Sequence, residues 1–145
     1  MDLLKLLALD TEDLAVISAQ VQDAVTRPGV IEYSPRNKRF SLVLNRFAWD
    51  AEGRPSAGSS AHERRQAVLS FARVLKARTV GIRRNDDEQV LSLLAVRFID
   101  GDTPAGTLEL VFADGPLIHL EVECVEAQLE DIGAAWETRF KPRHP

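Results

Sequence analysis

Apolar residues at every second position constrain the fold of this chain more than any other feature. Even-numbered residues are apolar from 108 to 112 and again from 118 to 122, and the same alternation begins the segment 39–49. The side chains of a strand point alternately to opposite faces, so each segment predicts a strand with one buried face. Residues 89–99 are apolar on both faces, which is typical of a central strand.

The two segments between residues 108 and 122 predict a hairpin of defined register. Opposed residues share a face, so even positions pair with even ones, which excludes a two-residue loop and fits a three-residue loop. The sequence Ala-Asp-Gly at 113–115 suits such a loop, with glycine at the left-handed third position. This register places Leu110 opposite Ile118 and Glu109 opposite His119.

Both ends of the chain carry helical signals. Residues 10–13 (Asp-Thr-Glu-Asp) offer an N-cap and acids for a first turn, so a helix is expected from about residue 11, giving way to extended chain near Val21. A short strand is expected at 30–33. Between 125 and 136 apolar residues recur at helical spacing, which predicts a terminal helix: Val125, Leu129, Ile132 and Trp136.

Residues 64–82 fit two structures. Ser60 and Glu63 have the spacing of a capping box, which favours a helix. In a strand, Leu69 and Leu75 share an apolar face. We favour the strand.

These elements predict an α+β fold of mainly antiparallel β structure. Six or seven strands joined by tight turns would form a strongly bent sheet, or a barrel like that of pleckstrin-homology domains, with a short N-terminal helix and a C-terminal capping helix. Such an analogy of element order carries no function.

The composition fits one compact domain over residues 1–145. The chain is 45% apolar and 28% charged, and its size allows a core without disulfides. Segment 50–63 is predicted to be a mobile loop and 138–145 a flexible tail. Cys124, the lone cysteine, is expected to be buried and fits a reducing compartment. An acid before the first apolar run and the lack of any membrane-length apolar stretch predict a cytoplasmic protein with no membrane partner.

Three stretches resemble a known family: L-L-A-L-D-T-E-D-L-A-V-I-S-A-Q-V-Q-D-A-V (6–25), R-F-S-L-V-L-N-R-F-A-W-D (39–50) and L-E-V-E-C-V-E-A-Q-L-E-D-I-G (120–133). They are similar to small alphaproteobacterial proteins known as a domain of unknown function. The resemblance spans about residues 3–138. It implies a bacterial cytoplasmic protein and brings no activity, cofactor or site residue.

Basic residues concentrate in the middle of the chain. Residues 27–84 hold thirteen basic and four acidic side chains, although the whole chain has a formal charge of −4. Arg46 falls on the core-facing phase of its strand, so it needs a partner carboxylate or a place at a barrel mouth. Trp49 on the opposite face could anchor an interface or pack under the following loop. The candidate binding residues are Arg46, Trp49, Arg64, Arg65 and Arg73.

One strand face gathers possible metal ligands. His119, Glu121 and Glu123 share a face, and Glu109 lies beside His119 on the neighbouring strand. One imidazole with carboxylates could hold a divalent ion. The favoured alternative is a solvated face on which Glu109 and His119 form a modest pair, with no metal and no cofactor.

No phosphate-binding loop, nucleophile elbow or paired C-x-x-C is present in the sequence. We therefore expect a non-enzymatic binding module that presents a sheet face or barrel rim to a protein partner or to a second copy. The alternative is an anion- or nucleic-acid-binding protein, or an enzyme whose site is built around the basic strand cluster. Acidic flanks disfavour nucleic acid, because they repel the same polyanion.

Overall fold

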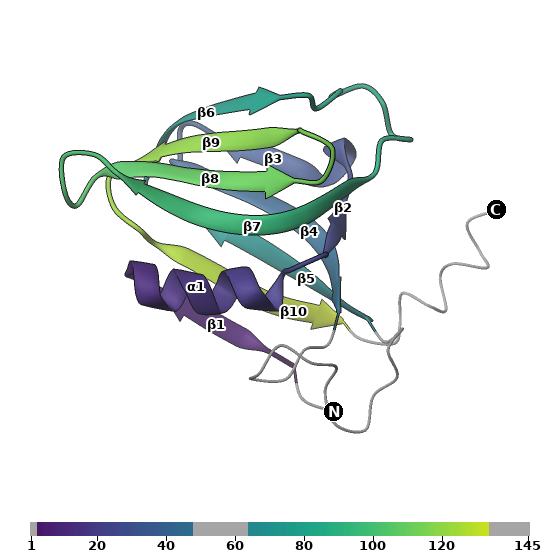
Figure 1. Ribbon diagram of the computed structural model, residues 1–145, viewed down its shortest axis with the longest axis horizontal. Helices are drawn as coiled ribbons and strands as arrows, with labels where there is room; N and C mark the ends of the chain where they lie inside the picture. The colour runs from purple at the N-terminus through teal and green to yellow at the C-terminus, as the bar shows by residue number, and fades with distance from the viewer. Residues whose placement is uncertain (1–2, 48–63, 134–145) are drawn as a thin grey trace.

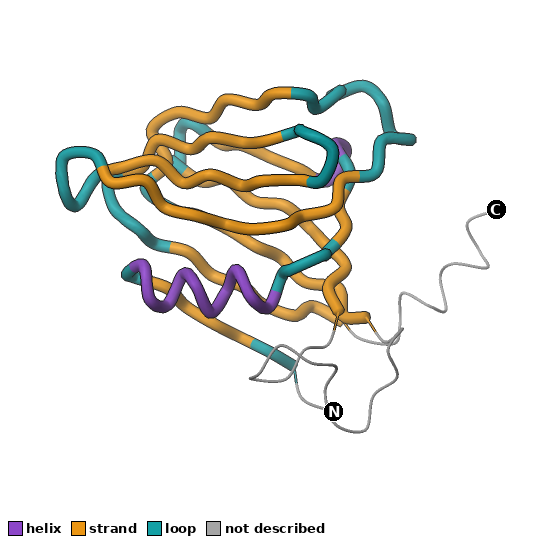
Figure 2. Tube along the Cα trace, in the orientation of Figure 1, coloured by secondary structure: helices purple, strands orange, loops and turns teal. Residues whose placement is uncertain are grey.

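A computed structural model describes residues 3–47 and 64–133. Antiparallel strands dominate these residues, and one α-helix accompanies them (Figure 2). In chain order the elements are β1 (Lys5–Ala8), α1 (Thr11–Gln20), β2 (Val25–Thr26), the 3-10 turn η1 (Pro28–Val30), β3 (Ile31–Ser34), β4 (Arg39–Phe47), β5 (Arg64–Phe71), β6 (Val74–Val80), β7 (Leu91–Asp100), β8 (Gly106–Phe112), β9 (Leu117–Val122) and β10 (Ala127–Gly133). The expected loop at 50–63, tail at 138–145 and Trp49 lie outside the described residues.

The strands form one sheet that does not close. Its order is β1-β10-β5-β4-β2-β7-β8-β9-β6, and β3 pairs with β4 beside this path. In the described residues no strand pairing joins β3 to β6, so the barrel of pleckstrin-homology type is wrong. The physical reason lies in β3, because a strand of four residues offers little edge for pairing.

The N-terminal helix forms where the sequence predicts it. The Asp10 side chain accepts a hydrogen bond from the Asp13 backbone N–H at 2.8 Å, which caps α1. Leu14 and Ile17 are buried in the core. Figure 1 shows α1 lying in front of the sheet, and its Ser18 hydroxyl accepts a hydrogen bond from the backbone N–H of a β7 residue at 2.9 Å.

The predicted C-terminal helix is wrong over its described residues. Ala127–Gly133 is a strand, β10, that pairs with β1 on one side and β5 on the other. Its buried face holds Ala127, Leu129 and Asp131. A carboxylate on the buried face hides the strand alternation in the sequence, and the remaining apolar residues then imitate helical spacing.

The predicted hairpin is confirmed. Leu110 lies opposite Ile118, and Glu109 lies opposite His119. The loop residue Gly115 has φ +105°, a left-handed conformation that glycine adopts without strain.

Two smaller expectations need correction. Residues 64–82 form two strands separated by a turn at Ala72 and Arg73, so Leu75 is exposed and does not share the buried face of Leu69. Cys124 is half-buried, because β9 ends at Val122 and the alternation stops there.

Within the described ranges, no helix combines the length and apolar character that crossing a bilayer requires.

Candidate functional site

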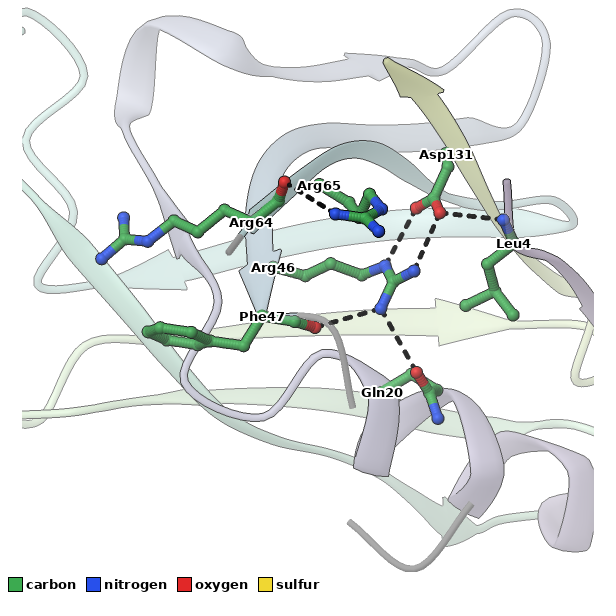
Figure 3. A network of polar contacts seen from close by, with 7 residues as sticks. All are labelled: Leu4, Gln20, Arg46, Phe47, Arg64, Arg65 and Asp131. Atoms are coloured by element: carbon green, nitrogen blue, oxygen red, sulfur yellow. Dashed lines mark hydrogen bonds and ion pairs between the residues drawn. The ribbon is translucent and has the colours of Figure 1, made fainter. Parts of the chain in front are cut away.

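Arg46 is the most deeply buried of the predicted site residues that the structure describes. Its Nε and Nη2 donate to the two carboxylate oxygens of Asp131 at 2.9 and 2.8 Å. The remaining Nη1 donates to the Gln20 side-chain oxygen and to the Phe47 carbonyl oxygen (Figure 3). The partner carboxylate that the sequence analysis requires is therefore present, and the guanidinium of Arg46 is fully used in holding the fold.

The other arginines do not converge with Arg46 into one site. Arg64 stacks over the Phe47 ring, 4.9 Å from its centroid, and points away from the buried pair (Figure 3). Arg65 lies opposite Arg46 on β5, and its Nη1 donates to the Arg64 carbonyl at 3.4 Å. Arg73 lies beyond the far end of β5. The predicted cluster is thus divided between the two ends of one strand.

Arg73 belongs to a group of exposed ion pairs. Its Nε lies 3.4 Å from the Glu126 carboxylate, and its Nη1 lies 4.0 Å from Glu123. Glu123 also pairs with Lys38 at 3.1 Å. Exposed pairs of this kind contribute little free energy each, and here they fasten the β5–β6 turn to the chain after β9.

The possible metal ligands form ion pairs instead of a cluster. His119 Nε2 lies 2.8 Å from a Glu109 carboxylate oxygen, and Arg97 donates to the other oxygen. The hydrogen bonds from His119 and from Arg97 lower the pKa of Glu109. Glu121 faces Lys76 across the β6–β9 pairing. No group of three potential ligands is found in the part of the chain that the structure describes.

A cavity separates the two strands that fail to pair. It has a volume of about 120 Å³, and both apolar and polar side chains line it. Tyr33 and Phe40 contribute rings from β3 and β4, and Ala77 and Thr79 face them from β6. Pro28, Ile31, Ile82 and Arg84 complete the lining. We call this space, with the facing edges of β3 and β6, the β3–β6 slot.

Contacts at its two ends limit the length of the slot. At one end the Val74 N–H donates to the Lys38 carbonyl at 2.9 Å, and the Tyr33 hydroxyl donates to the Val74 carbonyl at 3.4 Å. At the other end Pro28 of η1 and Ile82 of the loop after β6 border the cavity. The open stretch of β6 therefore runs from about Lys76 to Val80.

The hydrogen-bond phase of β9 shows which groups of β6 face the slot. Pro116 accepts from Phe112 on β8 at 3.0 Å, whereas the Glu123 N–H donates to the Arg73 carbonyl at 3.0 Å, towards β6. In an antiparallel ladder this direction alternates residue by residue, so odd-numbered residues of β9 bond to β6. Their partners are Lys76, Arg78 and Val80. The N–H and C=O groups of Ala77 and Thr79 consequently point into the slot.

Three cations border the slot without an ion pair. Lys76, Arg78 and Arg84 are exposed, and none of them pairs with a carboxylate among residues 3–47 and 64–133. The neighbouring Arg83 is different, because its Nε lies 2.8 Å from Asp86. The β6 side of the slot thus carries an excess of positive charge.

The slot is not predicted from the sequence, because its wall residues carry no chemical signature. Ala77 and Thr79 are small and chemically ordinary. A signal was nevertheless present: Lys76 and Arg78 alternate with these small residues, a pattern typical of an exposed edge strand. That pattern could have identified β6 as an edge.

The fold and the slot define the chain as a small, mainly antiparallel β protein. In the described residues its sheet stays open between β3 and β6. A family model described as "Protein of unknown function (DUF2948)" matches residues 4–144. The chain belongs to that family, as the sequence resemblance to a domain of unknown function implies. No curated protein matches the chain, and no solved structure does.

Proposed function

We propose that this protein is a non-enzymatic binding module that takes an extended segment of a partner protein into the β3–β6 slot. One observation carries the proposal: two strand edges that do not pair with each other in the described residues face a cavity of about 120 Å³. Strand addition uses this combination, because the backbone bonds of the free edge give affinity and pockets for alternate side chains give specificity.

The size and lining of the cavity favour a peptide over a small molecule. Clefts that enclose small-molecule ligands measure roughly 300–1,000 Å³ and carry several convergent polar groups. This cavity is smaller, and most of its lining side chains are apolar. It has room for one or two side chains of an added strand, whose backbone would bond to the free groups of Ala77 and Thr79.

The alternatives built on the basic strand cluster have weaker support. Arg46 is held by Asp131, and Arg73 pairs with Glu123 and Glu126. An enzyme or anion site needs such groups to converge on one bound molecule. Arg46 on β4 lies beside the start of β5 and Arg73 lies beyond its far end, so these two residues are not suited to that role.

A proline substitution tests the proposal. Thr79→Pro removes an N–H that faces the slot and leaves the β6–β9 ladder intact, so the fold is expected to persist. Three labelled peptides serve as probes, TVEVEVT, TVQVQVT and TVKVKVT, with binding measured by fluorescence anisotropy. At least one is expected to bind the unmodified protein and to lose about tenfold or more in affinity with Thr79→Pro, since backbone bonds carry strand addition.

Leu7→Pro is the matched control. Leu7 lies on β1, at the opposite end of the sheet, and is exposed. The Asp131 N–H donates to the Leu4 carbonyl at 2.9 Å, so by alternation the N–H of Leu7 also faces away from the ladder. This variant is expected to bind the peptides as the unmodified protein does. Equal loss in both variants, or no binding by any peptide, would contradict strand addition at the slot.

A further inference from the structure

Resting on the proposed function, we infer that the partner segment is an acidic strand, in which Asp or Glu alternates with apolar residues across from Lys76 and Arg78. The alternation of β6 itself leads to this inference. Ala77 and Thr79 lie opposite Leu120 and Ile118, on the core side of the sheet. Lys76 and Arg78 are exposed on the outer side.

The side chains of a strand added beside β6 would alternate between the same two faces of the sheet. Directly opposed residues of paired strands share a face, so residues opposite Ala77 and Thr79 would enter the cavity. Residues opposite Lys76 and Arg78 would stand beside an ammonium and a guanidinium. The slot therefore favours small apolar side chains at one set of positions and carboxylates at the other.

The strand on the other side of β6 already has this pattern. β9 and the residue after it read Leu120, Glu121, Val122, Glu123, with apolar residues inward and acids outward. Glu121 lies opposite Lys76. Within the fold Lys76 thus lies opposite an acid and Arg78 opposite His119, and the free edge presents the same basic side chains to an incoming strand.

A second copy of this chain is a poorer occupant of the same edge. Antiparallel pairing of β6 with β6 of another copy, centred on Ala77, would place Lys76 opposite Arg78. Like charges directly opposed across strands are destabilising. Basic residues on an edge strand therefore select against self-pairing and for an acidic partner.

The experiment compares the three peptides already named, whose outward residues are Glu, Gln or Lys. The acidic peptide is expected to bind about tenfold more tightly than the neutral one, and the basic peptide more weakly than both, because two cross-strand ion pairs are gained or opposed. A peptide of the same composition, TVVEEVT, removes the alternation and is expected to bind weakly.

Charge reversal identifies the residues involved. Lys76→Glu and Arg78→Glu, made singly, are each expected to abolish the preference for the acidic peptide, and the double variant is expected to reverse it towards the basic peptide. Lys5→Glu, on β1 at the other end of the sheet, is the control and is expected to leave the order of affinities unchanged. Raising the salt concentration should narrow the difference between acidic and neutral peptides, since exposed charges are screened.

The outcomes separate the inference from the proposed function. If the three peptides bind with equal affinity and Thr79→Pro weakens their binding, the acidic preference is overturned and strand addition is retained. Equal binding of TVEVEVT and TVVEEVT would reduce the preference to general attraction of charge and overturn it as well. Binding of single-stranded DNA that Lys76→Glu and Arg78→Glu abolish, with no peptide bound, would assign the rim to nucleic acid and overturn both.

Discussion

Asp131 on β10 binds the guanidinium of Arg46 on β4 although β5 lies between their two strands. Both side chains are almost fully buried, with 0% and 5% of their surface exposed. Asp131 also exchanges two hydrogen bonds with the backbone of Leu4, and Arg46 reaches Gln20 of α1. One ion pair thus connects β4, β10, the start of the chain and the helix.

Removing one member of this pair is expected to destabilise the protein strongly. Asp131→Ala leaves a buried guanidinium without a counter-charge, which costs about 3–5 kcal/mol. Urea unfolding followed by circular dichroism gives the free energy of unfolding. Glu123→Ala, which removes an exposed partner of Lys38 and Arg73, serves as the control and is expected to cost about 1 kcal/mol or less. A loss of that size for Asp131→Ala would show that the buried pair does not hold the fold.

Replacing both members should cost less than replacing one. Arg46→Leu combined with Asp131→Leu buries no charge, and apolar substitutes for buried ion pairs are often neutral or stabilising. The double variant is expected to be more stable than Asp131→Ala in the same urea experiment. If its unfolding free energy is lower, the polar contacts to Gln20 and Leu4 contribute more than the removal of charge.

The same pair shows where sequence reasoning succeeds and where it fails. Arg46 interrupts an otherwise clear alternation, so its strand is recognised and the need for a carboxylate follows from burial alone. Asp131 interrupts the alternation of a shorter strand and is sufficient to disguise it as a helix. Each charge is an anomaly in its own segment, and the explanation of both is a contact between residues 85 positions apart.

Lowering the pH is expected to weaken the outer face of the β7–β8–β9 sheet through Glu109. Hydrogen bonds from His119 and Arg97 lower the pKa of this carboxyl group below its ordinary value of 4.5. A carboxyl with a lowered folded-state pKa stabilises the protein above its unfolded-state pKa, and this contribution disappears as the pH falls through the folded-state pKa.

Glu109→Gln measures that contribution. The difference in unfolding free energy between the unmodified protein and this variant should be greatest above about pH 4.5 and should decrease at lower pH. Urea titrations at a series of pH values supply both curves. Glu121→Gln, on the same face, is a suitable control. A difference for Glu109→Gln that stays constant from neutral to strongly acidic pH would contradict the assigned role of the His119 and Arg97 contacts.

Gly106 at the start of β8 is expected to tolerate no side chain. A Cβ there would collide with the Ile99 carbonyl oxygen and the Phe98 ring. Gly106→Ala should therefore destabilise the protein by about 1–3 kcal/mol, as overpacking does. Gly29→Ala is the control, because its Cβ would meet only the end of the exposed Asp87 side chain. Thermal unfolding compares the two, and equal melting temperatures would contradict the close approach at Gly106.

The sequence-based prediction missed the slot for a different reason than it missed the C-terminal strand. Alternation identifies strands and their buried faces, and it defined the 108–122 hairpin to the residue. It carries no information on which strands remain unpaired at the end of a sheet, because that depends on the path of the whole chain. The predicted barrel assumed that the last edges meet, and β3 and β6 do not.

Amide hydrogen exchange tests the free edge of β6 without any ligand. Because hydrogen bonds alternate along the antiparallel β6–β9 pair, the N–H groups of Lys76, Arg78 and Val80 bond to β9, whereas those of Ala77 and Thr79 face the slot. Exchange measured by NMR should therefore alternate along β6, fast at Ala77 and Thr79 and slow at Lys76 and Arg78. Addition of a bound peptide should slow the two fast amides and leave the others unchanged. Slow exchange at Ala77 and Thr79 in the free protein would mean that another part of the chain already covers this edge, and the slot would then not be open to a partner.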